Sequence, residues 1–134
     1  DAVPPAFARR MRDWTCASGT FRMNVALSEL PDFTCLPNAG GAEGRHHRAS
    51  ILFTPSLGYL ERAFDDARQL GWARQPAIEM HIPSTIDPSL APPGCHVASL
   101  FCQQFAPLLP DGRQWPDERE AAADAVIDTK SWSS

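Results

Sequence analysis

Residues 56–71, SLGYLERAFDDARQLG, predict an amphipathic α-helix, and the rest of the fold can be placed around it. Its apolar residues recur at the spacing that puts side chains on one face of a helix. They are Leu60, Ala63, Phe64, Ala67 and Leu70. Ser56 precedes the helix, where its side chain can accept a hydrogen bond from an unpaired backbone N–H. Gly71 follows the last apolar residue, at the position where a glycine commonly ends a helix.

Strands are predicted on both sides of this helix. Residues 20–28 (TFRMNVALS) alternate between apolar and polar side chains, which is typical of a strand with one buried face. Residues 49–54 (ASILFT) form a short strand before the helix, and residues 77–82 (AIEMHI) alternate after it. Residues 96–105 (HVASLFCQQF) are apolar on both faces, as expected for a central strand.

Two further helices are predicted near the ends of the chain, over residues 5–14 and from Pro116 to about Asp128. The resulting order is α-β-β-α-β-β-α. It predicts an α+β fold in which a four-stranded, mostly antiparallel sheet carries two or three helices packed on one face. We expect residues 1–134 to form a single domain, with 129–134 (TKSWSS) as a frayed tail.

The composition excludes some classes of function. The 134 residues contain 12 Lys and Arg against 16 Asp and Glu, for a net charge of −4. This balance argues against a nucleic-acid partner, because phosphate backbones attract a basic surface. No apolar run is long enough to span a membrane, and no secretory signal is visible, so we expect a cytoplasmic location. The chain begins at Asp1 rather than Met, which suggests a processed product or a piece of a longer chain.

The cysteines do not form a recognisable metal or redox motif. Cys16, Cys35, Cys95 and Cys102 contain no C-x-x-C pair, so we expect free thiols in a reducing compartment and no metal site. A metal or redox-thiol protein remains an alternative, since Cys95 and His96 could form a corner with Cys102.

Signatures of self-contained catalysis are absent from the sequence. It contains no G-x-S-x-G, H-E-x-x-H or Walker loop, and the glycines at 40–44 lie in a loop between strands. The four histidines are the candidate chemical groups: His46, His47, His81 and His96. The His46–His47 pair could supply an acid or base near pH 7. The alternatives are a solvent-facing loop pair and polar residues on strands.

Three longer stretches carry a resemblance to a known family. They are FRMNVALSELPDF (21–33), HHRASILFTPSLGYLERAFDDA (46–67) and IEMHIPSTIDPSLAPPGCHVASLFCQQFAP (78–107). Together they resemble the substrate-domain segment of phytoene-dehydrogenase-related FAD oxidoreductases. The run IPS-x-x-D-x-x-LAPPG-x-HV is its most specific part, and the resemblance covers residues from 18 to about 128.

The resemblance implies a role within a longer flavoprotein. Family members hold FAD with a strand–GxGxxG–helix unit near the N-terminus and a second Gly-rich segment near the C-terminus, and neither is in this sequence. It therefore implies FAD in the full-length parent, no cofactor in this chain, and the missing FAD-binding domain as partner. The parent would transfer hydride from an apolar or unsaturated small molecule to the flavin, and this chain alone would be inactive.

The resemblance also bears on the candidate site residues. His46, His47, His81 and His96 are expected to face substrate or flavin in the parent, and the family pattern strengthens this for His46 and His47. It supplies no catalytic residue in this segment. The alternative function is a free-standing small α+β ligand-binding or dimerisation module without catalysis, which would bury its exposed surface by self-association.

Overall fold

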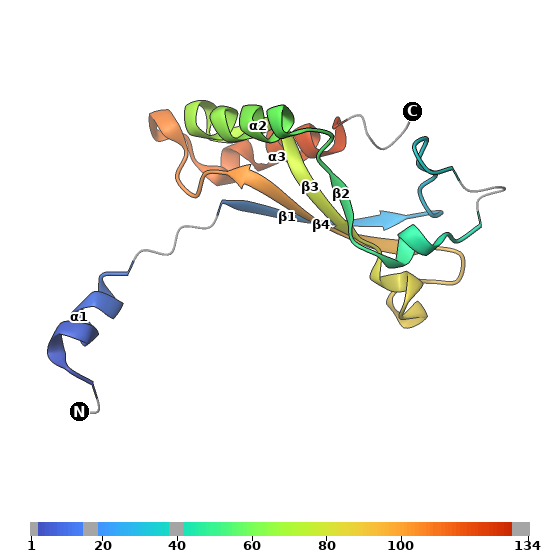
Figure 1. Ribbon diagram of the computed structural model, residues 1–134, viewed down its shortest axis with the longest axis horizontal. Coiled ribbons are helices and arrows are strands. Elements are labelled where there is room, and N and C mark those ends of the chain that lie inside the picture. Colours follow the sequence, from blue (N-terminus) through green and yellow to red (C-terminus); the bar gives the residue numbers. More distant parts are fainter. Residues whose placement is uncertain (1–2, 15–18, 38–41, 130–134) are drawn as a thin grey trace.

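In the computed structural model, which describes residues 3–14, 19–37 and 42–129, four strands form one antiparallel sheet (Figure 1). The strands lie in the order β1-β4-β3-β2. Their bounds are β1 (Thr20–Leu27), β2 (Ile51–Phe53), β3 (Trp72–His81) and β4 (His96–Phe105). The α-helices of the described residues are α1 (Pro5–Arg12), α2 (Leu57–Leu70) and α3 (Trp115–Ile127). The predicted α+β class and antiparallel sheet are confirmed.

β4 is a central strand, as its apolar character on both faces predicts. It pairs with β1 along the whole of that strand, from Thr20 opposite Gln103 to Leu27 opposite His96. On its other side it pairs with β3, where Ile78 lies opposite Cys102. β2 completes the sheet as a three-residue edge strand next to β3.

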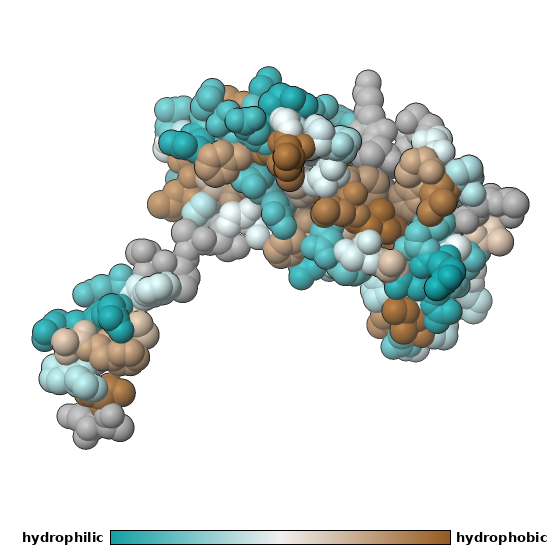
Figure 2. Space-filling view, viewed as in Figure 1, coloured by the Kyte–Doolittle hydropathy of each residue, from teal (hydrophilic) through white to brown (hydrophobic). Residues whose placement is uncertain are grey.

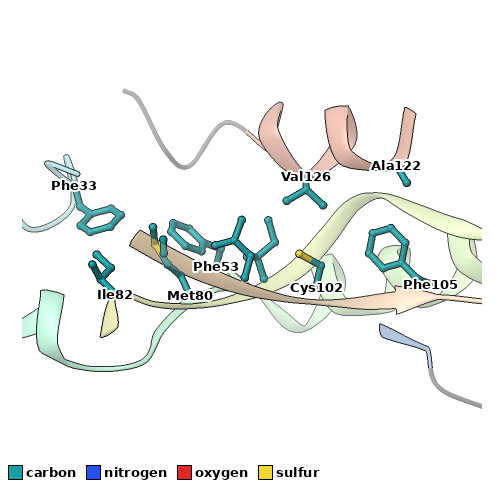
Figure 3. Packing of buried hydrophobic residues seen from close by; sticks show 11 residues of the cluster. Phe33, Phe53, Met80, Ile82, Cys102, Phe105, Ala122 and Val126 are labelled. Carbon is teal, nitrogen blue, oxygen red and sulfur yellow. The ribbon is translucent and has the colours of Figure 1, made fainter. Parts of the chain in front are cut away.

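The apolar core lies between one face of the sheet and α3 (Figure 3). Side chains from β3 and β4 alternate onto this face, and Ala122 and Val126 of α3 point down at them. Ile78, Met80 and Cys102 are fully buried. Removing a large apolar side chain from water contributes about 1.5–3 kcal/mol, so this layer provides much of the stability of the fold.

Aromatic rings close one end of this core. The ring centroids of Phe21 and Phe105 lie 5.2 Å apart, and those of Trp72 and Trp115 lie 5.8 Å apart. The indole Nε1–H of Trp115 donates a hydrogen bond of 3.0 Å to the carbonyl of Ala106. That bond satisfies the polar end of the tryptophan while its rings pack among the others.

The predicted ends of α2 are confirmed, but part of its predicted buried face is wrong. Ser56 Oγ accepts the Tyr59 N–H at 3.1 Å, and Gly71 adopts the left-handed conformation with φ of 99°. Phe64 of the predicted face is 48% exposed, whereas Tyr59 is buried and donates from its hydroxyl to the Pro76 carbonyl at 2.8 Å. The helix presents Tyr59 and Ala63 inward because it packs against β3, where this bond is made.

β3 begins earlier than the alternation predicts. The strand starts at Trp72 rather than at residue 77, and its pairing with β4 shifts register between Trp72 and Ala77. Pro76 within this stretch has no N–H to donate to the ladder. The irregular pairing hides the period-two pattern by which a strand is recognised in a sequence.

α1 lies away from the sheet (Figure 1), and none of its residues is buried. At the other end, Thr129 is buried and its Oγ1 donates to the Ala125 carbonyl at 2.8 Å. The rest of the predicted frayed tail, 130–134, lies outside the described residues. None of the helices in the described part of the chain is long and apolar enough to cross a bilayer.

Substitution of Gly71 by alanine should destabilise the protein strongly. A Cβ there would lie 2.7 Å from a methyl carbon of Leu109 and 2.9 Å from the Pro110 ring, on a backbone with φ of 99°. Strain and overpacking together predict a loss of about 2–4 kcal/mol in the free energy of unfolding, measured by urea denaturation. Gly58→Ala is the matched control, since the nearest atom is 3.5 Å away, and should change stability by less than about 1 kcal/mol. Equal effects of the two substitutions would contradict this explanation.

Candidate functional site

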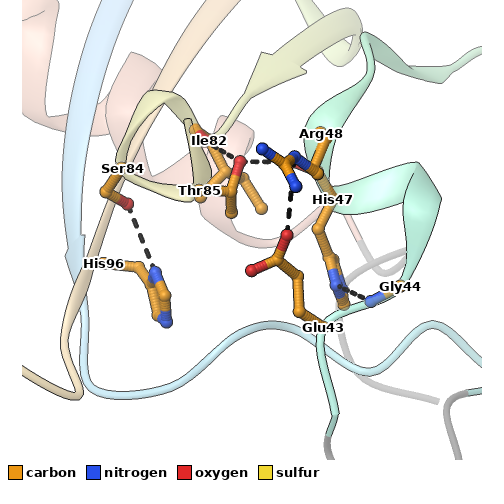
Figure 4. A network of polar contacts seen from close by, with 8 residues as sticks. All are labelled: Glu43, Gly44, His47, Arg48, Ile82, Ser84, Thr85 and His96. Carbon is orange, nitrogen blue, oxygen red and sulfur yellow. Dashed lines mark hydrogen bonds and ion pairs between the residues drawn. The ribbon is translucent and has the colours of Figure 1, made fainter. Parts of the chain in front are cut away.

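The structure places the four predicted histidines in two separate regions. His81 lies near the end of β3, on the face of the sheet opposite the apolar core. His46 and His47 lie in the 3₁₀-helix η2 (Arg45–Arg48), and His96 begins β4. His47 and His96 are linked through the 3₁₀-helix η3 (Pro83–Thr85), as Figure 4 shows.

His47 holds a loop together through both ring nitrogens. Nδ1 accepts the N–H of Gly44 at 3.0 Å, and Nε2 lies 2.8 Å from the carbonyl of Pro31. Since a carbonyl only accepts, the hydrogen of the ring is on Nε2. The side chain is 1% exposed, so the position of its ring is fixed and neither nitrogen points to solvent. A mainly structural role is what this geometry supports for His47.

Its neighbour His46 is only partly buried. The two ring centroids lie 4.1 Å apart, and the ring of His46 meets Phe33 edge-on at 5.7 Å. Partial burial lowers the pKa of His46, and the adjacent His47 lowers it further, while Asp32 acts in the opposite direction. His46 is therefore biased toward its neutral form at neutral pH.

His96 is attached to the rigid loop that follows β3. The Ser84 hydroxyl lies 3.3 Å from His96 Nδ1 and accepts the N–H of Val97 at 3.0 Å (Figure 4). Thr85 Oγ1 donates to the Ile82 carbonyl at 2.7 Å and lies 3.2 Å from the His47 carbonyl. Because Ser84 is buried, these bonds act to fix η3 against β4 and η2 rather than to present a nucleophile.

The second face of the sheet carries a polar patch, which we call the polar face. Strand register places Arg22, Phe101, Glu79 and Leu52 in one cross-strand row. Asn24, Ser99 and His81 form the next row. Side chains directly opposite on neighbouring strands are about 5 Å apart at Cβ, so members of a row can interact.

Glu79 is the centre of hydrogen bonding on the polar face. Its Oε1 accepts the Ser50 hydroxyl at 2.8 Å and lies 3.1 Å from His81 Nε2. The hydrogen bond from Ser50 lowers the pKa of the Glu79 carboxyl most, and that from His81 lowers it further. Glu79 therefore stays ionised at neutral pH and orients the His81 ring.

Arg22 makes two contacts beside this group. Its Nη1 donates to Ser99 Oγ at 3.2 Å, and its guanidinium lies over the Phe101 ring, 5.3 Å from the centroid. A cation over an aromatic face is attracted by the ring quadrupole. The polar face thus presents a positive, a negative and an imidazole group within two rows of the sheet.

Sequence reasoning placed His81 and Glu79 on one side of a strand but missed the contributions of Ser50, Ser99 and Phe101. The alternation of residues 20–28 correctly put Arg22 on the polar side. The pairing of β1 with β4, which brings Arg22 to Phe101, depends on long-range register that no local pattern encodes.

The cysteines of the described residues are spread over different environments. Cys35 and Cys95 are exposed, Cys102 is buried in the core, and Cys16 lies outside the described residues. Burial raises the pKa of Cys102 to about 12, which leaves it as an unreactive thiol. Within 3–14, 19–37 and 42–129, no group of three or more His, Cys, Asp or Glu side chains could hold a metal ion.

Ser50→Ala should raise the pKa of the Glu79 carboxyl toward its ordinary value, because it removes the largest stabilising contact of the ionised form. NMR titration of the Glu79 side chain measures this. A depressed pKa adds stability above the unfolded pKa and loses it as pH falls through the folded one. The stability difference from wild type should therefore exist at neutral pH and vanish in acid. Ser99→Ala, on the same face but bonded to Arg22, is the control and should shift the Glu79 titration much less, because Arg22 is the smallest of the causes that lower the pKa of Glu79.

Comparison with known proteins identifies relatives of this chain by sequence. The chain is 41% identical over 129 residues to pyridine nucleotide-disulfide oxidoreductase domain-containing protein 2 of Mus musculus, and 40% identical over the same length to the protein of that name in Rattus norvegicus. The match covers 94% of this chain but only 22% of each relative. No family model matches the chain, and no solved structure matches it. The chain is therefore homologous, over nearly all of its length, to one segment of much longer proteins named as oxidoreductases.

Proposed function

We propose that this chain is a substrate-domain segment of a longer, phytoene-dehydrogenase-like, FAD-dependent oxidoreductase and is inactive alone. The observation that carries the proposal is the extent of the match: 94% of the chain aligns with 22% of each relative. The names of these relatives supply the reaction class, and the sequence resemblance supplies the flavin. The two exposed free thiols suit the reducing conditions of a cytoplasmic protein.

The described residues do not fit a flavin-binding site. A pyrophosphate cradle needs a strand that leads through a Gly-rich turn into the N-terminus of an α-helix, within a parallel βαβ unit. Here the sheet is antiparallel, and Gly44 leads into η2, a single 3₁₀ turn, with its N–H bonded to His47. In the proposal the rest of the longer protein binds FAD, and this segment contributes the neighbouring substrate domain.

The polar face is the surface that we propose meets the rest of that protein. In this arrangement the sheet lies over the flavin and substrate, with His81 toward them, while His46, His47 and His96 position the loops. Arg22 and Glu79 contact the substrate in this arrangement. Burying an unpaired charge costs several kcal/mol, so these side chains need polar partners opposite them. A wholly apolar substrate would not supply those partners, so they must come from the FAD-binding domain or from a polar part of the substrate.

The gene surrounding this segment tests the proposal directly. An upstream frame should encode a strand leading into G-x-G-x-x-G, and a downstream frame a second Gly-rich flavin segment. The longer protein should purify with flavin absorbance, whereas residues 1–134 mixed with FAD should elute without it. Flanking DNA without either motif, or stoichiometric FAD on the chain alone, would overturn the proposal.

A matched pair of substitutions then tests the role of the polar face. Arg22 and Arg68 both lie over a phenylalanine ring, at 5.3 Å and 5.6 Å, but only Arg22 belongs to the polar face. Arg22→Glu should lower the melting temperature and flavin retention of the longer protein while hardly changing the melting temperature of the isolated chain. Arg68→Glu should change the melting temperature equally little in the longer protein and in the isolated chain. If Arg22→Glu changed the melting temperature equally in the longer protein and in the isolated chain, the polar face would be excluded as the contact surface.

The alternative, a self-associating module, is favoured by the exposed apolar residues on α1 and on either side of it. Phe7 and Met11 lie one helical turn apart on α1, and Val3 and Trp14 lie just before and after it; all four are between 41% and 65% exposed. Figure 2 shows hydrophobic surface on this helix, away from the rest of the chain.

Sedimentation of the 134-residue chain distinguishes the alternative. A dimerisation module should give a discrete dimer that Phe7→Glu dissociates and that Arg9→Glu, on another side of the helix, does not. A monomer, or aggregation that is insensitive to Phe7→Glu, would exclude the module.

A further inference from the structure

The long edge of the sheet is β1, and within the described ranges no strand pairs with its outer side. β1 is the first strand in the order β1-β4-β3-β2, so β4 is its neighbour on one side alone (Figure 1). All of its residues, Thr20–Leu27, pair with β4 in one continuous register. Every second residue of such a strand directs its N–H and C=O away from the sheet. These groups form a template on which another strand can add.

β1 lacks the features by which native proteins keep an edge strand from pairing. Such edges are commonly protected by prolines, lysines, bulges or a covering segment. Thr20–Leu27 contains no proline and no lysine, and its pairing with β4 shows no shift in register. No backbone hydrogen bond from the described loops and helices reaches residues 20–27. The outer side of β1 is therefore open to a partner strand.

The apolar side chains of β1 are symmetric about Asn24. Phe21 and Met23 precede it on the core face of the sheet, and Val25 and Leu27 follow it on the same face. All four are only partly buried, at the margin of the core. Two antiparallel copies of β1 that are centred on Asn24 would place Phe21 opposite Leu27 and Met23 opposite Val25. Every apolar residue of one copy would thus meet an apolar residue of the other.

The same centre keeps like charges apart. Arg22 would lie opposite Ala26 of the second copy, whereas a pairing centred on Arg22 would place two guanidinium groups directly opposite each other, which is destabilising. A centre at Met23 or Val25 leaves an apolar residue at one end without an apolar residue opposite it. A centre between two residues would put core-facing side chains of one copy on the polar side of the other. Asn24 is thus the centre that both the charge and the apolar pattern favour.

We infer that β1 is a self-complementary docking edge, and that its partner is β1 of a second copy of this chain, paired antiparallel about a two-fold axis at Asn24. The two sheets then form one continuous sheet, and the partly buried apolar residues of each β1 are covered by those of the other. A two-fold interface of this kind closes on itself, so association stops at the dimer. The contact is made by the backbone edge of β1 and leaves the polar face open, so the inference does not rest on the proposed flavoprotein role.

Cysteine cross-linking tests the position of the axis. With Cys16, Cys35 and Cys95 replaced by serine, Asn24→Cys should form an intermolecular disulfide on mild oxidation, because directly opposite Cα atoms lie about 4.5–5.5 Å apart. Ala26→Cys is the matched control, on the same strand and face and likewise exposed. Its two copies would be offset along the strands by about 14 Å, too far for a disulfide. Equal yields at the two positions, including no cross-link at either, would overturn the inference.

Charge exchange at Asn24 gives a measurement that does not depend on disulfide geometry. In sedimentation velocity the wild-type chain should form a discrete dimer. Asn24→Lys and Asn24→Asp should each sediment as monomers, because each variant puts like charges directly opposite on the axis. An equimolar mixture of the two variants should restore the dimer, since opposite charges then meet there.

Phe7→Glu should leave this dimer intact, which separates pairing through β1 from association through α1. A wild-type chain that sediments as a monomer would overturn the inference. A dimer that Asn24→Lys leaves intact, or one that Phe7→Glu dissociates, would overturn it as well.

Discussion

The central position of β4 is the constraint on which the rest of the structure depends. Its pairing with β1 and β3 decides what lies on each face of the sheet. Leu100 and Cys102 face the core, and Ser99 and Phe101 alternate with them onto the polar face. Because successive side chains of a strand point to opposite sides, a slip by one residue would exchange the two sets. The core and the candidate site are therefore specified by the same register.

Much of this arrangement could be predicted from local sequence patterns. Alternation located β1, and Ser56 and Gly71 marked the ends of α2 because capping chemistry is local. The first half of β3 was missed, since the shift in register near Pro76 interrupts the alternation. Tyr59 was also missed as a buried residue, because the bond from its hydroxyl to the Pro76 carbonyl is a tertiary contact.

The candidate site was less predictable than the fold, for a physical reason. The sequence shows that a residue is a histidine and can titrate near neutral pH, but it does not show which groups the ring nitrogens bond to. The ring of His47 is buried with both nitrogens engaged, whereas His81 is exposed and bonded to Glu79. The two residues look alike as candidates until long-range contacts are known. The polar face likewise arises from cross-strand neighbours that are far apart in the sequence, such as Arg22 and Phe101.

The distribution of burial explains how a segment corresponding to 22% of its relatives can have a core of its own. The most deeply buried residues, among them Ile78 and Val126, lie between the sheet and α3 and need no other chain to exclude water. Large apolar residues that remain exposed, such as Leu52, Phe64 and Leu108, lie on an edge strand, a helix surface and a loop. Most of the stability therefore comes from contacts made within this chain. A substitution in the core should therefore act equally in the isolated chain and in a longer protein, while Arg22→Glu on the polar face should cost more stability where a partner is present.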